Sequence, residues 1–196
     1  DTLGAEIIRL WVASTDYSGE LSLSDEILKR VVESYRRLRN TARYLLSNLA
    51  GFEPARDLLK PEEMLALDRW VLNRARSLHQ DIVAAYDSYS FHVIYQRLHQ
   101  FCSVDLGGFY LDVLKDRVYT ARADSVARRS AQTAMYQLLE ALARWMAPIL
   151  SFTAEEIWRN MPGSRGASVL LETWYTLPAD LAQDELTSEV YWDKVL

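Results

Sequence analysis

The sequence predicts an all-α protein, an antiparallel helical bundle with minor β content near its ends. Apolar residues recur every three or four positions over long stretches, which is the period of an amphipathic helix. The segments between these stretches are short, and several contain proline or glycine. Because short connections make successive helices run antiparallel, the two patterns together favour a bundle.

The longest predicted helix runs from Ser24 to Gly51. Ser24 suits the N-cap position, and Asp25 and Glu26 follow it in the first turn, where the helix dipole favours anions. Gly51, with Pro54 behind it, is expected to end the helix. At about 100° per residue, one buried stripe is formed by Ile27, Val31, Tyr35, Leu38, Ala42, Leu45 and Leu49.

The segments on either side of this helix are shorter. Residues 1–14 predict a short helix packed on both sides, and 16–23 a connector whose brief alternation allows a small strand. A loop over 52–60 leads to a second long helix from Pro61 to about Ser88, because proline fits the first helical position. Further helices are predicted over 90–102, 109–119 and 125–146.

Turn and breaker residues divide the second half of the chain. The pair Gly107 and Gly108 is the strongest helix breaker there, and Pro148 bends or ends the helix that precedes it. Residues 168–174 have the branched and aromatic content of one short strand. The residues from Asp184 onward predict the start of a last helix.

The clearest local signal lies just beyond Pro148. Thr153 and Glu156 have the spacing of a capping box, and Phe152 and Ile157 that of the accompanying hydrophobic staple. The pattern predicts a helix from Ala154 to about residue 161.

Composition bounds the function classes. The length of 196 residues suits one large domain or a domain with an appendage, and no apolar run is long enough to cross a membrane. The start lacks a secretory signal, and the missing initiator methionine favours a fragment. Cys102 is the only cysteine, which excludes an internal disulfide and fits a cytoplasmic protein.

Charge is segregated along the chain. The net charge of −5 argues weakly against nucleic-acid binding, but residues 172–196 contain six acidic residues and one lysine. Residues 115–129 hold five basic residues against two acidic ones, so a basic face can exist despite the average.

A second basic region lies on the longest predicted helix, beside its apolar stripe. Lys29, Arg36, Arg39 and Arg43 form a strip there, and Glu33 is the one acidic residue between 28 and 43. A helix anchored on one side and lined with arginines on the next can lie along a phosphate backbone. For the helix considered alone, an ordinary solvated charged face is the competing interpretation.

The sequence indicates no active site. His92, His99 and Cys102 could share a helical face, but seven residues separate the histidines, about 10 Å, which is too far for one metal ion. Asp112 and Asp116 alternate with basic residues and favour surface ion pairs. There is no glycine-rich phosphate loop and no nucleophile–histidine arrangement.

Four segments of the chain are informative together: DTLGAEIIRLWVASTDYSGELSLSDEIL, SYRRLRNTARYLLSNLAGF, FCSVDLGGFYLDVLKDRVYTA and RWMAPILSFTAEEIW. In sequence and in order they resemble bacterial isoleucyl-tRNA synthetases, which belong to class Ia. The resemblance covers essentially the whole chain. It implies a helical bundle of the class Ia anticodon-binding type.

The resemblance also implies a division of the chain. Residues 1–23 would be the end of the segment that follows the KMSKS signature and contacts the tRNA stem. Residues 24–162 would be the anticodon-binding bundle, and 163–196 a strand, a loop and the start of a helix leading to a C-terminal domain. Neither HIGH nor KMSKS is present. The piece would therefore bind tRNA(Ile) for an ATP-dependent isoleucine–tRNA ligase without being catalytic itself.

Partners and cofactors follow from the same resemblance. The fragment is expected to need no cofactor, whereas the parent would use ATP with Mg²⁺ and bind zinc outside this region. The catalytic, editing and C-terminal domains of the parent would be its neighbours. We expect a cytoplasmic monomer that contacts no membrane. The alternative is a helical protein-interaction module that docks an acidic partner or another domain of its parent.

Basic side chains are the candidate tRNA contacts, because arginine holds phosphate bidentately and stacks on bases. The first set is Arg36, Arg39 and Arg43, and Asn40 is expected to contact either RNA or a neighbouring helix. Trp70, Trp145 and Trp158 are expected in the core rather than as stacking platforms. A second set consists of Lys115, Arg117, Arg122, Arg128 and Arg129.

Overall fold

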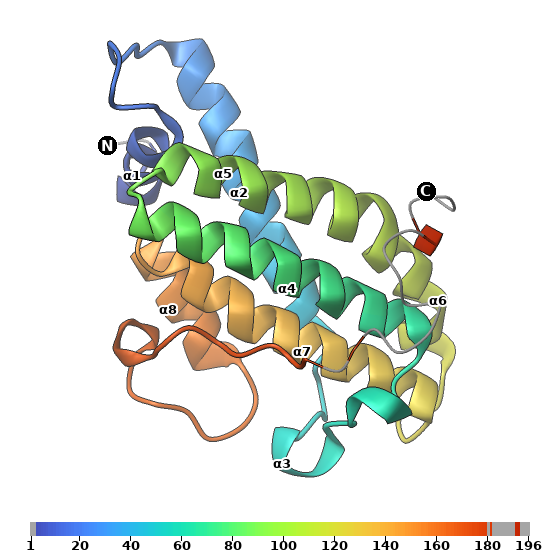
Figure 1. The fold of residues 1–196 in the computed structure, drawn as a ribbon. Coiled ribbons are helices and arrows are strands. Elements are labelled where there is room, and N and C mark those ends of the chain that lie inside the picture. Colours follow the sequence, from blue (N-terminus) through green and yellow to red (C-terminus); the bar gives the residue numbers. More distant parts are fainter. Residues whose placement is uncertain (1–2, 180, 182–190, 193–196) are drawn as a thin grey trace.

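The computed structural model describes residues 3–179, 181 and 191–192, and within them it confirms an all-α fold (Figure 1). The α-helices are α1 (Ala5–Ser14), α2 (Asp25–Ser47), α3 (Pro54–Asp57), α4 (Ala66–Asp87), α5 (Phe91–Gln100), α6 (Leu111–Thr120), α7 (Val126–Met146) and α8 (Ser151–Asn160). A π-helix, η2 (Phe101–Tyr110), joins α5 to α6, and two short 3₁₀ turns are η1 (Pro61–Glu63) and η3 (Val169–Leu171).

The predicted minor β content is absent from the residues that the structure describes. Residues 16–23 form turns and extended backbone, and the strand expected over 168–174 is instead a 3₁₀ turn followed by extended backbone that pairs with no neighbour. The helix expected from Asp184 lies outside the described residues, apart from Tyr191 and Trp192.

The helices form a bundle with α7 at its centre. In Figure 1, α4, α7 and the continuous rod of α5, η2 and α6 lie side by side, while α2 crosses behind them. Helix α8 turns back from α7, and α1 lies at the same end of the bundle beside α5 and α2. The core is continuous, and its largest fully buried side chains include Trp70, Trp145, Tyr110, Leu45, Ile82 and Met135. Trp158 is also buried, as expected.

Helix α2 begins as predicted. The Ile27 amide donates to the Ser24 hydroxyl at 3.2 Å, which satisfies one of the free amides of the first turn. Val31, Leu38 and Leu45 are buried on one side. The helix ends at Ser47, earlier than predicted, and Gly51 takes a φ of +74° in the turn that follows. This turn carries Leu49 and Phe52 into the core.

The second long helix also starts later than predicted, because Pro61 opens only the 3₁₀ turn η1. Met64 and Leu65 then take extended backbone before α4 begins at Ala66. The predicted loop before it contains the single turn of α3.

Gly107 and Gly108 do not break the helix, which corrects the prediction. The chain stays helical from Phe91 to Thr120, and the glycines lie inside the π-helix. A β-carbon on Gly107 would lie 2.9 Å from the Cys102 carbonyl oxygen, so this turn requires glycine. Burial of side chains on both sides of the glycine pair keeps the segment helical despite its low intrinsic propensity.

The start of α8 also differs from the prediction. The helix begins at Ser151, so Thr153 lies inside it, and Phe152 is 71% exposed and cannot act as a staple. The Glu6 carboxylate from α1 accepts hydrogen bonds from the amides of Phe152 and Thr153 instead, at 3.4 and 3.2 Å. The Thr153 hydroxyl forms a hydrogen bond with the Tyr35 hydroxyl, with 3.0 Å between the two oxygen atoms. A cap supplied by a distant helix replaces the local one.

Helix α1 also holds the turn that precedes α8. The Arg9 guanidinium donates to the carbonyls of Ile149 and Pro148 at 2.7 and 2.9 Å. One short helix thus binds the α7–α8 turn with a cation and the start of α8 with an anion, the charge that the N-terminal end of a helix favours.

We expect Glu6→Ala to lower the free energy of unfolding by about 1 kcal/mol, the value typical of a lost helix cap. Thermal or urea unfolding followed by circular dichroism measures the change. Glu20→Ala is the matched control, since it removes the same charge from an exposed position in the following loop. An unfolding free energy equal to that of the wild type would show that Glu6 does not cap α8.

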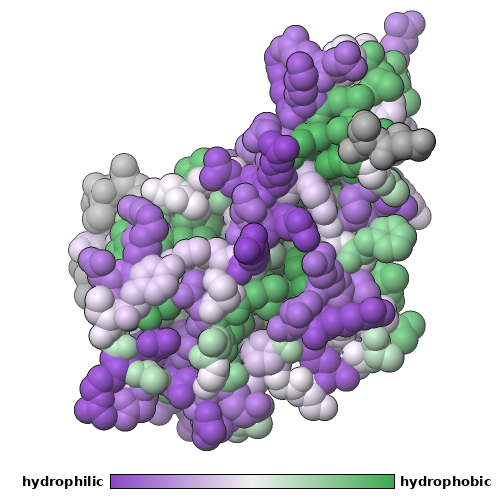
Figure 2. Space-filling model, turned by 180° about the vertical axis from the view of Figure 1, so that it is seen from behind, coloured by the Kyte–Doolittle hydropathy of each residue, from purple (hydrophilic) through white to green (hydrophobic). Residues whose placement is uncertain are grey.

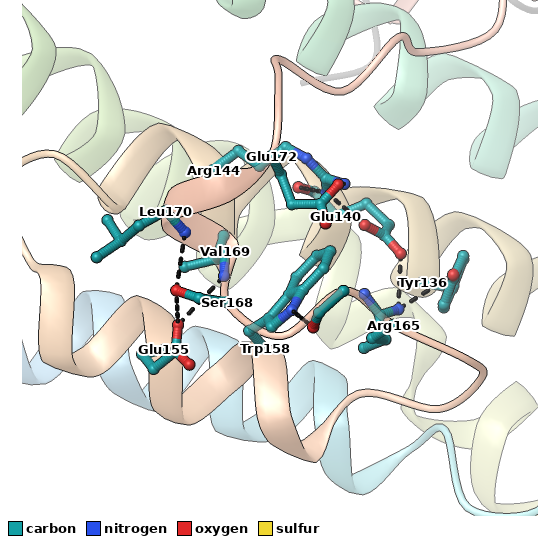
Figure 3. Close-up of polar contacts among 11 residues, drawn as sticks. Tyr136, Glu140, Arg144, Glu155, Trp158, Arg165, Ser168, Val169, Leu170 and Glu172 are labelled. Atoms are coloured by element: carbon teal, nitrogen blue, oxygen red, sulfur yellow. Dashed lines mark hydrogen bonds and ion pairs between the residues drawn. The ribbon is translucent and has the colours of Figure 1, made fainter.

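The segment after α8 folds back over α7 through a buried ionic and aromatic cluster (Figure 3). The Trp158 ring lies between two guanidinium groups, with Arg144 Cζ at 4.7 Å and Arg165 Cζ at 4.4 Å from its centre. Glu140 accepts from both arginines, and the bond from Arg165 measures 2.6 Å. The Trp158 indole donates to the Gly166 carbonyl at 3.0 Å, which holds the segment in place.

Burial by itself raises the pKa of the Glu140 carboxyl, but hydrogen bonds from Arg165, Tyr136 and Arg144 outweigh it and hold the pKa below its ordinary value. A carboxyl whose pKa is lowered by folding stabilises the fold above its unfolded pKa. That contribution is lost as the pH falls through the lowered value.

Glu140→Gln is therefore expected to cost about 3 kcal/mol at pH 7, because two buried guanidinium groups lose their anion. The difference from wild type should shrink as the pH falls from the ordinary glutamate pKa through the lowered pKa of the folded protein, where the wild-type carboxyl becomes protonated. Urea unfolding over a pH series measures it. Glu172→Gln is the control, since Glu172 meets Arg144 only at 3.5 Å and at a more exposed position. A difference independent of pH would contradict the assignment.

Candidate nucleic-acid interface

The exposed face of α2 carries two rows of cations. With 100° between successive residues, Asn40 lies near the middle of this face. Arg36, Arg39 and Arg43 lie on the side toward α8, and Arg30 and Arg37 on the side toward η2. Figure 2 shows this side of the molecule, where hydrophilic side chains follow α2 along its length.

The three arginines on the α8 side are exposed and only weakly engaged. Arg36 pairs with Glu33 at 2.7 Å, and Arg39 approaches Glu156 of α8 at 3.4 Å, with all four side chains more than half exposed. Arg43 is exposed and has no ion pair with any residue in the described part of the chain. Exposed pairs contribute little stability, so a phosphate group can compete for these guanidinium groups.

A groove with a volume of about 490 Å³ separates α2 from α8. Its floor is apolar and consists of Ala42, Leu46 and Ile157. Polar side chains from both helices surround this floor: Arg39, Asn40, Arg43, Ser47, Thr153, Glu156 and Asn160.

Asn40 lies at the rim of this groove. Its amide is exposed and makes no hydrogen bond to α8 or to any other residue that the structure describes. Its four hydrogen-bonding sites are therefore open to solvent or to a ligand.

The second predicted set lies on α6, on the α6–α7 connection and at the start of α7. Lys115 and Arg122 are exposed and pair with Asp112 at 2.5 Å and Asp124 at 2.9 Å. These two remain accessible to a ligand, because both ion pairs are exposed.

Arg117, Arg128 and Arg129 are engaged within the protein. Arg128 donates to the Ala121 carbonyl at 3.2 Å, and Arg129 lies 3.3 Å from the Asp57 carboxylate. Asp57 also accepts hydrogen bonds from Arg56, and these bonds lower the pKa of the Asp57 carboxyl to about 2.

Arg117 belongs to a buried network around Asp68. It donates two hydrogen bonds to the fully buried Asp68 carboxylate, at 2.7 and 2.9 Å, and its own side chain is 17% exposed. Tyr110 donates to the same carboxylate at 2.8 Å, as does Ser130. Burial, together with the Asp68 charge, raises the pKa of the Tyr110 phenol. The network ties α4, α6, α7 and η2 together.

Arg117→Ala is expected to lower the free energy of unfolding by about 3 kcal/mol, because Asp68 would keep a buried charge without its cation. Chemical unfolding measures the change. Arg122→Ala removes an equal charge from a neighbouring exposed position and is expected to change stability by less than about 0.5 kcal/mol. Equal effects of the two substitutions would show that the Asp68 network does not stabilise the bundle.

The sequence pattern does not indicate the α8 wall of the groove. It places Glu156 in a capping box, and no pattern marks Asn160. Their role as neighbours of Arg39 and Arg43 depends on how α8 packs against α2. Four residues separate the two, so they share a face of α8, and that spacing was the one local signal.

Within the described residues, no cluster of three or more histidine, cysteine or acidic side chains is arranged to hold a metal ion. Cys102 is buried, and burial raises the pKa of its thiol to about 12, far from a reactive or ligating form. None of the described helices combines the length and the apolar character that a bilayer span needs.

The chain is a helical bundle whose α2 exposes a row of arginines to solvent. Residues 68–195 match the family described as the anticodon-binding domain of tRNA ligase, and the chain belongs to this family. It is 61% identical to the isoleucine–tRNA ligase of Thioalkalivibrio sulfidiphilus, and 59% identical to those of a Marinomonas species and of Methylococcus capsulatus. Each match covers 100% of this chain and 21% of the relative, so the chain spans about a fifth of their length.

Proposed function

We propose that this chain is the tRNA-binding region of an isoleucine–tRNA ligase and holds the anticodon stem and loop of tRNA(Ile) against the exposed face of α2. The observation that carries the proposal is the row of exposed, weakly engaged arginines beside an open groove. The anticodon-binding family supports it, as do relatives named isoleucine–tRNA ligase.

Phosphate contacts would come chiefly from Arg36, Arg39 and Arg43. A guanidinium fork holds a phosphate bidentately, and the rigid, buried underside of α2 keeps the three groups in register. Asn40 lies among them and can donate to phosphate, ribose or base. Lys115 and Arg122 would add contacts farther along the molecule, whereas Arg117, Arg128 and Arg129 would act by holding the bundle together.

The rest of the ligase would supply the chemistry. In this proposal residues 1–23 end the segment that joins the catalytic part, 24–162 are the anticodon-binding bundle, and 163–196 lead to a C-terminal domain. ATP and Mg²⁺ would be used by the catalytic part, editing would take place in another domain, and zinc would bind outside this chain. The protein would act as a monomer in the cytoplasm.

An apolar surface favours a second role, docking onto another domain of the same ligase. Ile8 and Val12 of α1 are about half exposed and line a groove of about 380 Å³ with Tyr86, Phe91 and Ile149. Such a surface suits a protein neighbour better than RNA, and it lies at a different place from the α2 arginines.

Alanine at Arg36, Arg39 and Arg43 together is expected to weaken binding of an anticodon stem-loop RNA and to flatten its salt dependence. Each lost phosphate contact removes roughly 0.7 to 0.9 from the slope of log K against log salt, so the slope should fall by about 2. Fluorescence anisotropy over a salt series measures both quantities.

The control variant replaces Lys60 and Arg97 by alanine. Both cations are exposed, and Arg97 pairs with Asp81 between α5 and α4, away from the face of α2 that lies toward α8. Slope and affinity should stay near the wild-type values. If the triple variant also keeps them, the α2 arginines are not the RNA contact.

A further inference from the structure

We infer that the groove between α2 and α8 receives one unstacked base of an RNA loop and reads its edge with Glu156 and Asn160, and that guanine is the base it fits best. The inference rests on the proposed RNA-binding function and deepens it. Neither residue is among the phosphate-contact candidates, and both come from α8 rather than α2.

The shape of the groove suits a flat aromatic ligand. Its volume of about 490 Å³ lies within the roughly 300–1,000 Å³ of sites that hold small molecules. Ala42 and Ile157, almost fully buried, form its floor together with the half-buried Leu46. Apolar contact with the face of a base is favourable for every base, so the floor can hold a base without selecting it.

The α8 wall presents hydrogen-bond acceptors. The Glu156 carboxylate is acceptor-only, and its one cationic neighbour among the described residues, Arg39, approaches no closer than 3.4 Å. Asn160 donates its amide nitrogen to the Glu156 backbone carbonyl at 2.8 Å, which leaves its side-chain oxygen open as a second acceptor. The α8 wall therefore selects among bases by the number and position of the hydrogen-bond donors that each base offers.

Guanine meets this requirement best. Its Watson–Crick edge carries the N1–H and N2–H₂ donors side by side, which a single carboxylate can accept together. Inosine lacks the exocyclic amino group and offers one donor. Uracil places its one N–H between two carbonyl oxygens, so its edge would bring electron-rich atoms against the Glu156 charge.

The α2 wall has the opposite charge and orients the nucleotide. Arg43 has no ion-pair partner in the described part of the chain, and it lines the groove opposite Glu156 and Asn160. A phosphate on Arg43 and a base edge on Glu156 satisfy both walls at once. The reverse orientation would place the phosphate beside a carboxylate.

The test uses RNA hairpins whose loop is all uridine except for one position, which is guanosine, inosine or uridine. The variable base is moved through the loop, and binding to the 196-residue chain is followed by fluorescence anisotropy over a salt series, with the loops compared at equal salt. At one loop position, guanosine is expected to bind roughly tenfold more tightly than inosine or uridine, the discrimination typical of one bidentate base contact.

Glu156→Gln assigns the preference to the groove. It is expected to reduce the guanosine-over-inosine ratio to within about twofold and to strengthen binding of the all-uridine loop, since a negative charge is removed. Glu33→Gln is the matched control, because it removes an equally exposed carboxylate that pairs with Arg36. It should strengthen binding of every loop while leaving the tenfold preference intact.

The outcomes separate this inference from the proposed function. Salt-dependent binding with equal affinity for all loops would overturn the base site and leave α2 as an RNA surface. A preference that survives Glu156→Gln would overturn the role of the α8 wall. Salt-independent or absent binding of every hairpin would overturn the proposed function and the base site together.

Discussion

The burial of one narrow stripe of α2 is the constraint on which the rest of the interface depends. Val31, Leu38 and Leu45 fix the rotation of the helix against the core. Once that rotation is set, the buried side of α2 is occupied by its apolar residues. The basic residues between 29 and 43 lie outside this stripe and therefore face solvent. The cations are thus exposed by packing, without help from the weak ion pairs beside them.

Arginine has two separate uses in this protein, and burial distinguishes them. Arg117, Arg144 and Arg165 lie against carboxylates that are themselves buried, where a lost partner is costly. Arg39 and Arg43 face solvent; the carboxylate beside Arg39 is 3.4 Å away, and no described carboxylate pairs with Arg43. Basic residues in the second half of the chain therefore hold the bundle together more than they present charge, although the sequence alone makes the two kinds look alike.

The sequence predicted what depends on neighbours along the chain and missed what depends on contacts across it. Ser24 caps α2 by accepting a hydrogen bond from an amide three residues along the chain, so the local sequence is enough to predict its role. Gly107 was misjudged, because core packing on both sides keeps the segment helical despite its glycines. Thr153 was misjudged because Glu6, distant in sequence, already satisfies the start of α8. The α2 arginines were found from the helical period, whereas the α8 wall needed the fold.

The same reasoning explains how a chain with a net charge of −5 can present a cationic face. Charge acts on a polyanion over about a Debye length, roughly 8 Å at physiological salt, so the local arrangement on α2 outweighs distant acids. The one acid that α8 brings to this face, Glu156, weakens attraction for phosphate in general. A strip made only of arginines would bind the phosphates of any RNA equally well. In the base-reading role that we infer, Glu156 lowers the affinity for phosphate but supplies discrimination among bases.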